Sequence, residues 1–222
     1  YKSFRRWTLD QFEKKYPFTL IGGYTGSGKT DLLMALQSAG QSVLDLEGLA
    51  HHKGSAFGNI GQPEQPSQEQ FENKLSLALL NLSKNSPDKI WVEDESQRIG
   101  RLNVPGPIWE QMRSAAVLFL EIPFGERLKY IVKGYGFLEA QRLIDATDRI
   151  RKKLGDKNAT DAIEYISNGQ VLPAFDILLR YYDKFYLKSL FNRENAQALI
   201  QVIEATEVIE SNIQLLLNHR SQ

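Results

Sequence analysis

Gly23-Tyr24-Thr25-Gly26-Ser27-Gly28-Lys29-Thr30 decides the fold, because this stretch matches the phosphate-binding pattern G-x-x-x-x-G-K-[ST] at every position. The apolar run at 18–21 before it predicts a buried strand, and residues 31–36 after it predict the start of a helix. Backbone N–H groups of such a loop point inward, and the N-terminal end of the following helix adds partial positive charge. A Gly- and Ser-rich turn that only caps a helix is the alternative, but few such turns carry Lys and Thr at these two places. The predicted phosphate-binding residues are Gly23, Tyr24, Thr25, Gly26, Ser27, Gly28, Lys29 and Thr30.

Four further apolar runs predict the remaining strands of a parallel sheet. They cover residues 42–46, 90–92, 115–120 and 198–203, and helices are predicted between them at 68–83, at 108–113 and from 126 onward. The helix at 68–83 has the clearest start, because Ser67 precedes it as an N-cap with Gln70 three residues later. Strands separated by helices predict an α/β fold, a P-loop NTPase-like parallel sheet with helices on both faces plus a C-terminal helical subdomain.

The chain divides into four predicted segments. Residues 1–16 are expected to form an entry helix or linker, 17–136 the α/β core, 137–192 a continuously helical subdomain, and 193–222 a return strand with a closing helix over 206–218. Two stretches of the core, 48–67 and 99–107, are predicted as loops. The first contains four glycines and two prolines, and loops of this length are often functional.

Acidic residues follow two of the predicted strands. Glu93 comes directly after the third strand, where carboxylates of nucleotide-binding sheets hold Mg²⁺. We therefore expect Glu93 to act as a catalytic residue and, with Thr30, as a metal ligand; Asp94 is the second choice, and a solvated acidic turn is the alternative. Asp45 ends the second strand at the edge where open α/β sheets bind ligands. Contact with the ligand and capping of the following loop remain equal alternatives for Asp45.

Two basic residues are expected to act at the phosphates. Lys29 is predicted to reach the outer phosphates as a catalytic residue. Arg127 opens the helix after the fourth strand, a position from which an arginine can stabilise the charge of a phosphoryl group in the transition state.

Composition excludes several classes of protein. Among the 222 residues, Lys plus Arg and Asp plus Glu are both 27, so net charge indicates no partner and any nucleic-acid contact needs a local patch. No apolar run approaches the ~20 residues of a membrane span, and no signal-peptide pattern is present, so we expect no membrane association and a cytoplasmic location. Cysteine is absent, which excludes disulfides and thiol nucleophiles within these residues. Because the chain begins with Tyr1 rather than Met, we expect it to be a piece of a longer protein.

Several segments beyond the phosphate loop resemble the tRNA 2-selenouridine synthase family. The opening residues 1–6 look like the junction that follows the rhodanese-like domain of that family. The order and spacing of the segments, more than any one of them, carry the resemblance. The other segments are 44–58, 65–68, 71–73, 91–96, 99–100 and the pair Tyr182-Asp183 with Tyr186.

The resemblance implies a transferase that replaces sulfur by selenium in 2-thiouridine at the wobble position of tRNA. It implies selenophosphate as selenium donor and an S-geranylated intermediate made from geranyl diphosphate. The expected content of the P-loop is Mg²⁺ with a nucleoside triphosphate or with geranyl diphosphate, and ATP, GTP, geranyl diphosphate and selenophosphate all remain open as its ligand. A rhodanese-like domain carrying a cysteine precedes the P-loop domain in the family, so this chain alone is expected to be incomplete for selenation. The resemblance also makes His52 a predicted ligand contact, with a solvated His51-His52 pair as the alternative.

Two other functions compete with this interpretation. A small-molecule kinase or NTPase uses the same loop, with the helical block as a lid and Arg127 as a transition-state arginine. A regulatory module that binds a nucleotide without turnover is the third. A basic cluster in the helical block, diluted by Asp145, Asp148 and Asp156, is a predicted contact for tRNA phosphates. Its members are Arg149, Arg151, Lys152, Lys153 and Lys157.

Overall fold

The computed structural model describes residues 1–84 and 87–219, and the chain forms two compact units. The first, here called the α/β unit, comprises Tyr1–Gly22, Thr30–Phe119 and Arg193–Gln201. The second, the helical unit, comprises Gly23–Lys29, Leu120–Asn192 and Val202–Gln222. The boundary falls inside the phosphate-binding motif, so Lys29 belongs to the helical unit and Thr30 to the α/β unit.

Five parallel strands form the main sheet, in the order β2-β3-β1-β6-β7. Phe18 of β1 lies opposite Ile90 of β3, and Ile21 lies opposite Glu93. Every residue of β1 and β3 is buried, which explains why both read as continuous apolar runs without alternation. A separate antiparallel pair, β4 and β5, follows β3 in the chain. The strands are β1 Phe18–Gly23, β2 Val43–Leu44, β3 Ile90–Glu93, β4 Arg98–Ile99, β5 Leu102–Asn103, β6 Ala116–Glu121 and β7 Ile200–Glu204.

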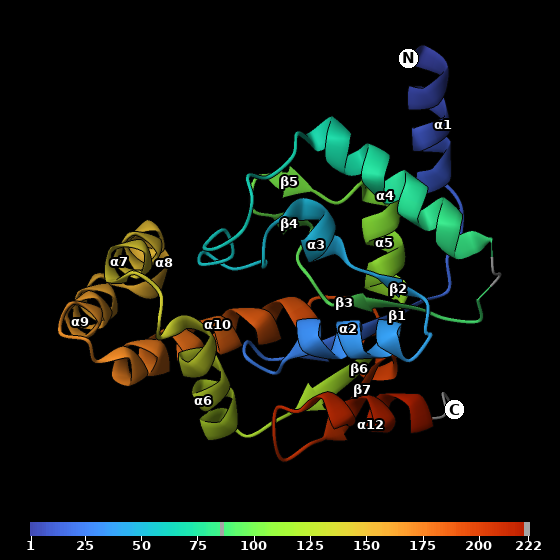
Figure 1. Cartoon of the computed structure of the whole chain (residues 1–222). Helices are drawn as coiled ribbons and strands as arrows, with labels where there is room; N and C mark the ends of the chain where they lie inside the picture. Colours follow the sequence, from blue (N-terminus) through green and yellow to red (C-terminus); the bar gives the residue numbers. More distant parts are fainter. Residues whose placement is uncertain (85–86, 220–222) are drawn as a thin grey trace. The chain divides into compact units, whose positions relative to one another are not determined.

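The helices of the α/β unit are organised around α4, which packs against α1, α3, β2 and β5 (Figure 1). α4 begins with a capping box, in which the Ser67 hydroxyl accepts from the Gln70 amide and the Gln70 side chain accepts from the Ser67 amide. Its buried face carries Phe71, Leu75 and Leu79, at helical spacing. The helices that lie wholly or mainly in this unit are α1 Lys2–Phe12, α2 Lys29–Ser38, α3 Leu46–Ala50, α4 Gln68–Ser83, α5 Gly106–Ser114 and α11 Ala196–Leu199.

The helical unit is organised around α10, the 21-residue helix that packs against α6 and α9. Figure 1 shows α7, α8 and α9 grouped beside one end of α10. Among the described residues, no helix combines the length and the apolar content that a membrane crossing requires. The helices here are α6 Phe124–Tyr135, α7 Ala140–Arg149, α8 Arg151–Leu154, α9 Asp156–Ser167, α10 Val171–Phe191, the 3₁₀ turn η1 Glu210–Asn212 and α12 Ile213–Asn218.

The predicted fold class is confirmed: a parallel α/β sheet flanked by helices, with a helical C-terminal portion. The predicted continuous helix over 137–191 is wrong in detail, because Gly155 and Gly169 adopt positive φ values of 92° and 71° and separate the helices there. The segment boundaries at 16, 136 and 192 stay predictions. The last three residues of the predicted closing segment, 220–222, lie outside the described residues.

Four local predictions are also corrected. The second strand covers only Val43–Leu44, because Asp45 caps a short helix, Leu46–Ala50, which takes the place of the first predicted loop residues. The second predicted loop contains the β4–β5 hairpin. The return strand begins at Ile200, after a short helix. The closing helix is shorter than predicted, since residues 206–209 are not helical. The hydrogen bonds of the sheet instead extend past β7, because the Ala205 amide donates to the Glu121 carbonyl.

Candidate functional site

The predicted phosphate-binding loop, of which Gly23–Lys29 lie in the helical unit, depends on its glycines for its shape. Gly26 and Gly28 have φ values of 81° and 72°, a conformation that side chains rarely adopt. A Cβ on Gly26 would come within 2.9 Å of the Arg127 carbonyl oxygen, and one on Gly23 within 2.5 Å of the Ser27 hydroxyl oxygen. The Ser27 amide donates to the Tyr24 carbonyl at 3.1 Å, which closes the turn. The sequence folds this way because the three glycines permit both the backbone angles and the close approach.

Two polar groups of the loop are directed in ways that suit an anionic ligand. The Lys29 ammonium donates to the Gly23 carbonyl at 3.0 Å, so the cation lies beside the first residue of the loop. The Ser27 hydroxyl is buried and has no hydrogen-bond partner among the described residues. A buried hydroxyl without a partner is costly, and a polar ligand in the loop would satisfy it.

Arg127 is buried, and the protein itself occupies its guanidinium. Its Nε donates to the Ile122 carbonyl at 3.0 Å, and one terminal nitrogen donates to the carbonyl of Thr25, inside the loop, at 2.9 Å. The two terminal nitrogens also form a bidentate pair with Asp183 of α10, at 2.9 and 2.8 Å. Burial raises the pKa of the Asp183 carboxyl, and the Arg127 charge opposes that rise. The guanidinium lies 4.6 Å from the centre of the Tyr24 ring, a further contact with the loop.

Three carboxylates gather in the α/β unit. Glu47 of α3, Glu93 at the end of β3 and Glu95 just beyond it each offer an oxygen within 4.8 Å of the others, and Glu47 and Glu93 are buried. The Thr30 hydroxyl donates to Glu47 at 3.4 Å. Gly54 closes over the group with a φ of 63°, because a Cβ there would meet oxygens of both Glu47 and Glu95 within 2.8 Å. Several carboxylate oxygens and one hydroxyl are the donor set that a hard divalent cation prefers.

The structure separates Glu93 from its predicted alternative. Asp94 forms a buried ion pair with Arg193 at 2.7 Å, and its amide donates to the Ile21 carbonyl. Glu93 instead belongs to the carboxylate group, together with Glu47, which also accepts the hydrogen bond from Thr30. Asp45 accepts from the Gly48 amide at 2.7 Å as the N-cap of α3, which is the capping alternative left open for this residue.

His52 is buried in the loop that follows α3, and it is not a member of the carboxylate group. A Cβ on Gly58 would lie 2.8 Å from its ring, and one on Gly100 would lie 2.7 Å from it, so these glycines make room for the imidazole. His51 is solvent-accessible by comparison and lies at 2.9 Å from the Glu64 carbonyl through Nδ1. The ligand contact predicted for His52 stays a prediction.

Sequence reasoning missed four residues of the site: Glu47, Glu95, Asp183 and Tyr186. Glu47 and Glu95 lie within two residues of predicted site residues, and the clustering of acids at two strand ends was the available signal. Asp183 and Tyr186 were singled out only as part of the family resemblance, and their roles could not be assigned, because Asp183 meets Arg127 across 56 positions of the chain.

An open cavity of about 940 Å³ in the helical unit borders the loop at Tyr24. Its lining includes Arg127 and Asp183, so the cavity adjoins the groups that hold the loop. The rest of the wall is mixed. Its apolar members are Ile122, Pro123, Phe124, Leu187, Ala205 and Leu215, and its polar or charged members are Glu121, Arg180, Lys184, Glu204, Thr206 and Asn212.

Comparison with known proteins places the chain in a family. The model of the tRNA 2-selenouridine synthase AAA domain matches residues 16–214. A tRNA 2-selenouridine synthase of Shewanella sediminis is 34% identical over 227 residues, which cover 88% of this chain and 60% of the relative. Proteins of the same name from Marinobacter nauticus and Nitrosomonas eutropha are 38% and 36% identical, over 70% and 76% of this chain. The chain spans 42–60% of the length of these three relatives. The chain belongs to the tRNA 2-selenouridine synthase AAA domain family.

Proposed function

We propose that the chain is the phosphate-binding domain of a tRNA-modifying transferase with the activity named for its relatives, tRNA 2-selenouridine synthase. The proposal is supported by the complete phosphate-binding motif, which lies inside the region that matches the family. Within this loop, the buried Ser27 hydroxyl has no hydrogen-bond partner among the described residues. The family match does not favour the small-molecule kinase or NTPase as an alternative.

The loop, in this proposal, binds the diphosphate or triphosphate of the ligand through its backbone N–H groups and Lys29. Thr30, Glu93, Glu47 and Glu95, which lie together in the α/β unit, would hold Mg²⁺. The buried carboxylates support this role, because a cation offsets the repulsion between them. Lys29 thus contacts the phosphates directly, whereas Arg127 keeps the loop in place through Thr25.

The cavity beside Tyr24 favours a ligand with an apolar portion. A diphosphate bound in the loop could extend a prenyl chain along the apolar side chains Phe124, Leu187 and Leu215 of this mixed wall. We therefore put geranyl diphosphate ahead of ATP, GTP and selenophosphate as the ligand of the loop.

The complete reaction needs more than these residues. We propose that selenophosphate supplies selenium to 2-thiouridine of tRNA through an S-geranyl intermediate, with a rhodanese-like domain contributing the thiol. The 222 residues contain no cysteine to carry selenium or sulfur, which supports this division. Contact with tRNA falls to exposed basic residues of the helical unit, such as Lys152 and Lys153; Arg151 is already paired with Asp148 and Asp156.

Calorimetric titration tests the proposal directly. Geranyl diphosphate, ATP, GTP and selenophosphate are each titrated into the protein with and without Mg²⁺. We expect saturable binding of geranyl diphosphate, tightest with Mg²⁺. A protein that binds none of the four ligands would contradict the proposal. Tight binding of ATP followed by phosphate release would instead support the NTPase function.

A further inference from the structure

Two side chains of α10, Asp183 and Tyr186, face the phosphate-binding loop from the same side of their helix. They are three residues apart, a spacing that places side chains on one helical face. Both contact the loop or a residue that holds it, and all of these residues lie in the helical unit.

Tyr186 contacts the loop at both of its ends. Its hydroxyl oxygen accepts a hydrogen bond from the Gly23 amide at 3.1 Å, at the first residue of the motif. Its ring lies 5.6 Å from the Lys29 ammonium and 6.3 Å from the Tyr24 ring, in an edge-to-face arrangement. One tyrosine therefore meets the first, second and seventh residues of the loop.

Asp183 acts on the middle of the loop through Arg127. The bidentate pair fixes the plane of the guanidinium, and the same guanidinium donates to the Thr25 carbonyl. The Arg127 backbone also borders Gly26, because a Cβ there would come within 2.9 Å of the Arg127 carbonyl. Without the Asp183 carboxylate, the Arg127 guanidinium could rotate out of the orientation in which it donates to the Thr25 carbonyl.

A loop with three glycines has many conformations, and only some of them point the backbone N–H groups inward. Contacts that hold Gly23 and Thr25 reduce this freedom before any ligand arrives. A ligand then loses less affinity to the ordering of the loop.

We propose that Asp183 and Tyr186 are positioning residues that preorganise the phosphate-binding loop. This inference rests on the proposed function for its effect on ligand affinity, but its effect on the free loop does not depend on any ligand. Neither side chain needs to touch the phosphates.

Four variants test the proposal, two of them matched controls on the same helix. Tyr186→Phe removes only the hydroxyl, and Tyr181→Phe makes the same change at a tyrosine that packs against Tyr182 and Phe185. Asp183→Asn removes one carboxylate charge, and Asp176→Asn does so where the partner is the exposed Arg180. Hydrogen exchange at the amides of 23–29 is measured in the ligand-free protein, and the Kd for inorganic diphosphate with Mg²⁺ is measured by calorimetry.

We expect faster exchange in the loop for Tyr186→Phe and Asp183→Asn, and wild-type exchange for both controls. The Kd for diphosphate should rise about three- to tenfold for Tyr186→Phe, the effect of one hydrogen bond, and about tenfold or more for Asp183→Asn. The melting temperature of Tyr186→Phe should fall by a few degrees at most, and wild-type exchange outside 23–29 separates positioning from general stabilisation. If the Asp183→Asn variant does not fold, the exchange rates and the Kd of the Tyr186→Phe variant alone decide whether the proposal holds.

Wild-type exchange in 23–29 for the folded Tyr186→Phe variant would overturn the inference, as would equal Kd values for Tyr186→Phe and Tyr181→Phe in a protein that binds diphosphate. Failure of the wild type to bind diphosphate would count against the proposed function, and the exchange measurement would still judge the positioning role.

Discussion

The two groups of candidate functional residues, one in each unit, are built in opposite ways. In the helical unit, the phosphate-binding loop is a glycine-rich turn whose shape is held by side chains of α6 and α10. In the α/β unit, the carboxylates stand on or beside regular elements, with Glu93 fixed in β3 and Glu47 in α3. The first part offers backbone groups, which mutation cannot remove but can misplace. The second offers side chains, which mutation removes without moving the backbone.

The largest effect is expected where the backbone itself is misplaced. In Gly26→Val, the side chain would meet Ile131 and the Arg127 carbonyl, and the φ of 81° would be strained. We expect binding of phosphorylated ligands to fall below detection by calorimetry, with some loss of stability. Gly125→Ala, where a Cβ meets nothing within 4 Å, is the control and should bind as the wild type does. Tight binding by a folded Gly26→Val protein would mean that the loop is not the site.

Neutralising two carboxylates should act on the other half of the comparison. In Glu47→Gln/Glu93→Gln, two charged ligands of the proposed Mg²⁺ are lost, and each charged contact contributes about 1.5–3 kcal/mol. We expect the Mg²⁺-dependent part of ligand affinity to fall roughly a hundredfold or more, with little change in binding measured without Mg²⁺.

The control for the carboxylates is Glu110→Gln, an exposed acid on α5. It should keep the full response to Mg²⁺. If the double variant responds to Mg²⁺ as strongly as the wild type, the three carboxylates do not hold the ion.

Removing the one cation of the loop should have a smaller effect than either change. Lys29→Ala leaves the backbone N–H groups in place and deletes one charged hydrogen bond, worth about 1.5–3 kcal/mol. We expect the Kd for the phosphorylated ligand to rise about ten- to a hundredfold while circular dichroism stays unchanged. Lys133→Ala, at the end of α6, serves as the charge-matched control. Identical ligand affinity in Lys29→Ala and the wild type would leave the lysine without a role in binding.

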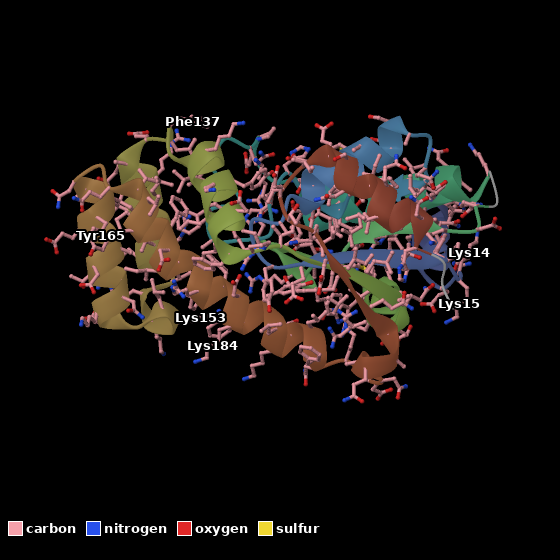
Figure 2. All side chains as sticks on the ribbon, turned by 90° about the horizontal axis from the view of Figure 1, so that it is seen from below. Lys14, Lys15, Phe137, Lys153, Tyr165 and Lys184 are labelled. Carbon is pink, nitrogen blue, oxygen red and sulfur yellow. The ribbon has the colours of Figure 1, made fainter. Side chains whose placement is uncertain are left out.

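The smallest effect is expected for basic residues outside both parts. Lys153 projects from the surface of the helical unit (Figure 2), and Lys152 is also exposed. Changing both to Ala should weaken tRNA binding several-fold and lower the slope of log K against log salt by about one unit for each lost phosphate contact. Ligand binding in the loop should not change. Lys14→Ala/Lys15→Ala, just after the end of α1, is the control. An equal loss of tRNA affinity in both double variants would mean that Lys152 and Lys153 form no specific tRNA-binding patch.

The sequence predicted what neighbouring residues determine. The phosphate-binding pattern, the buried runs of β1 and β3, and the capping box at Ser67 each depend on residues a few positions apart, and each prediction of local structure is confirmed. Short elements were missed, because a five-residue helix at Leu46–Ala50 and two-residue strands carry no periodicity to detect. The pair of Arg127 with Asp183 depends on how α6 and α10 pack, which no local pattern encodes. The catalytic and ligand-binding roles of the site residues stay predictions.

Asp94 and Arg193 are 99 positions apart in the chain, yet their ion pair is buried within the α/β unit. During synthesis at about 5–20 residues per second, Asp94 leaves the ribosome roughly 5–20 seconds before its partner. Until Arg193 arrives, the hydrogen-bonded ion pair is missing, and Asp94 beside β3 has the weaker electrostatic interaction with Arg113 to offset its burial. The helices between them make mostly local contacts, and local contacts form quickly. We therefore expect the helices to form first and the acidic end of β3 to settle late, so that the carboxylates proposed to bind Mg²⁺ reach their final arrangement only after Arg193 has been made.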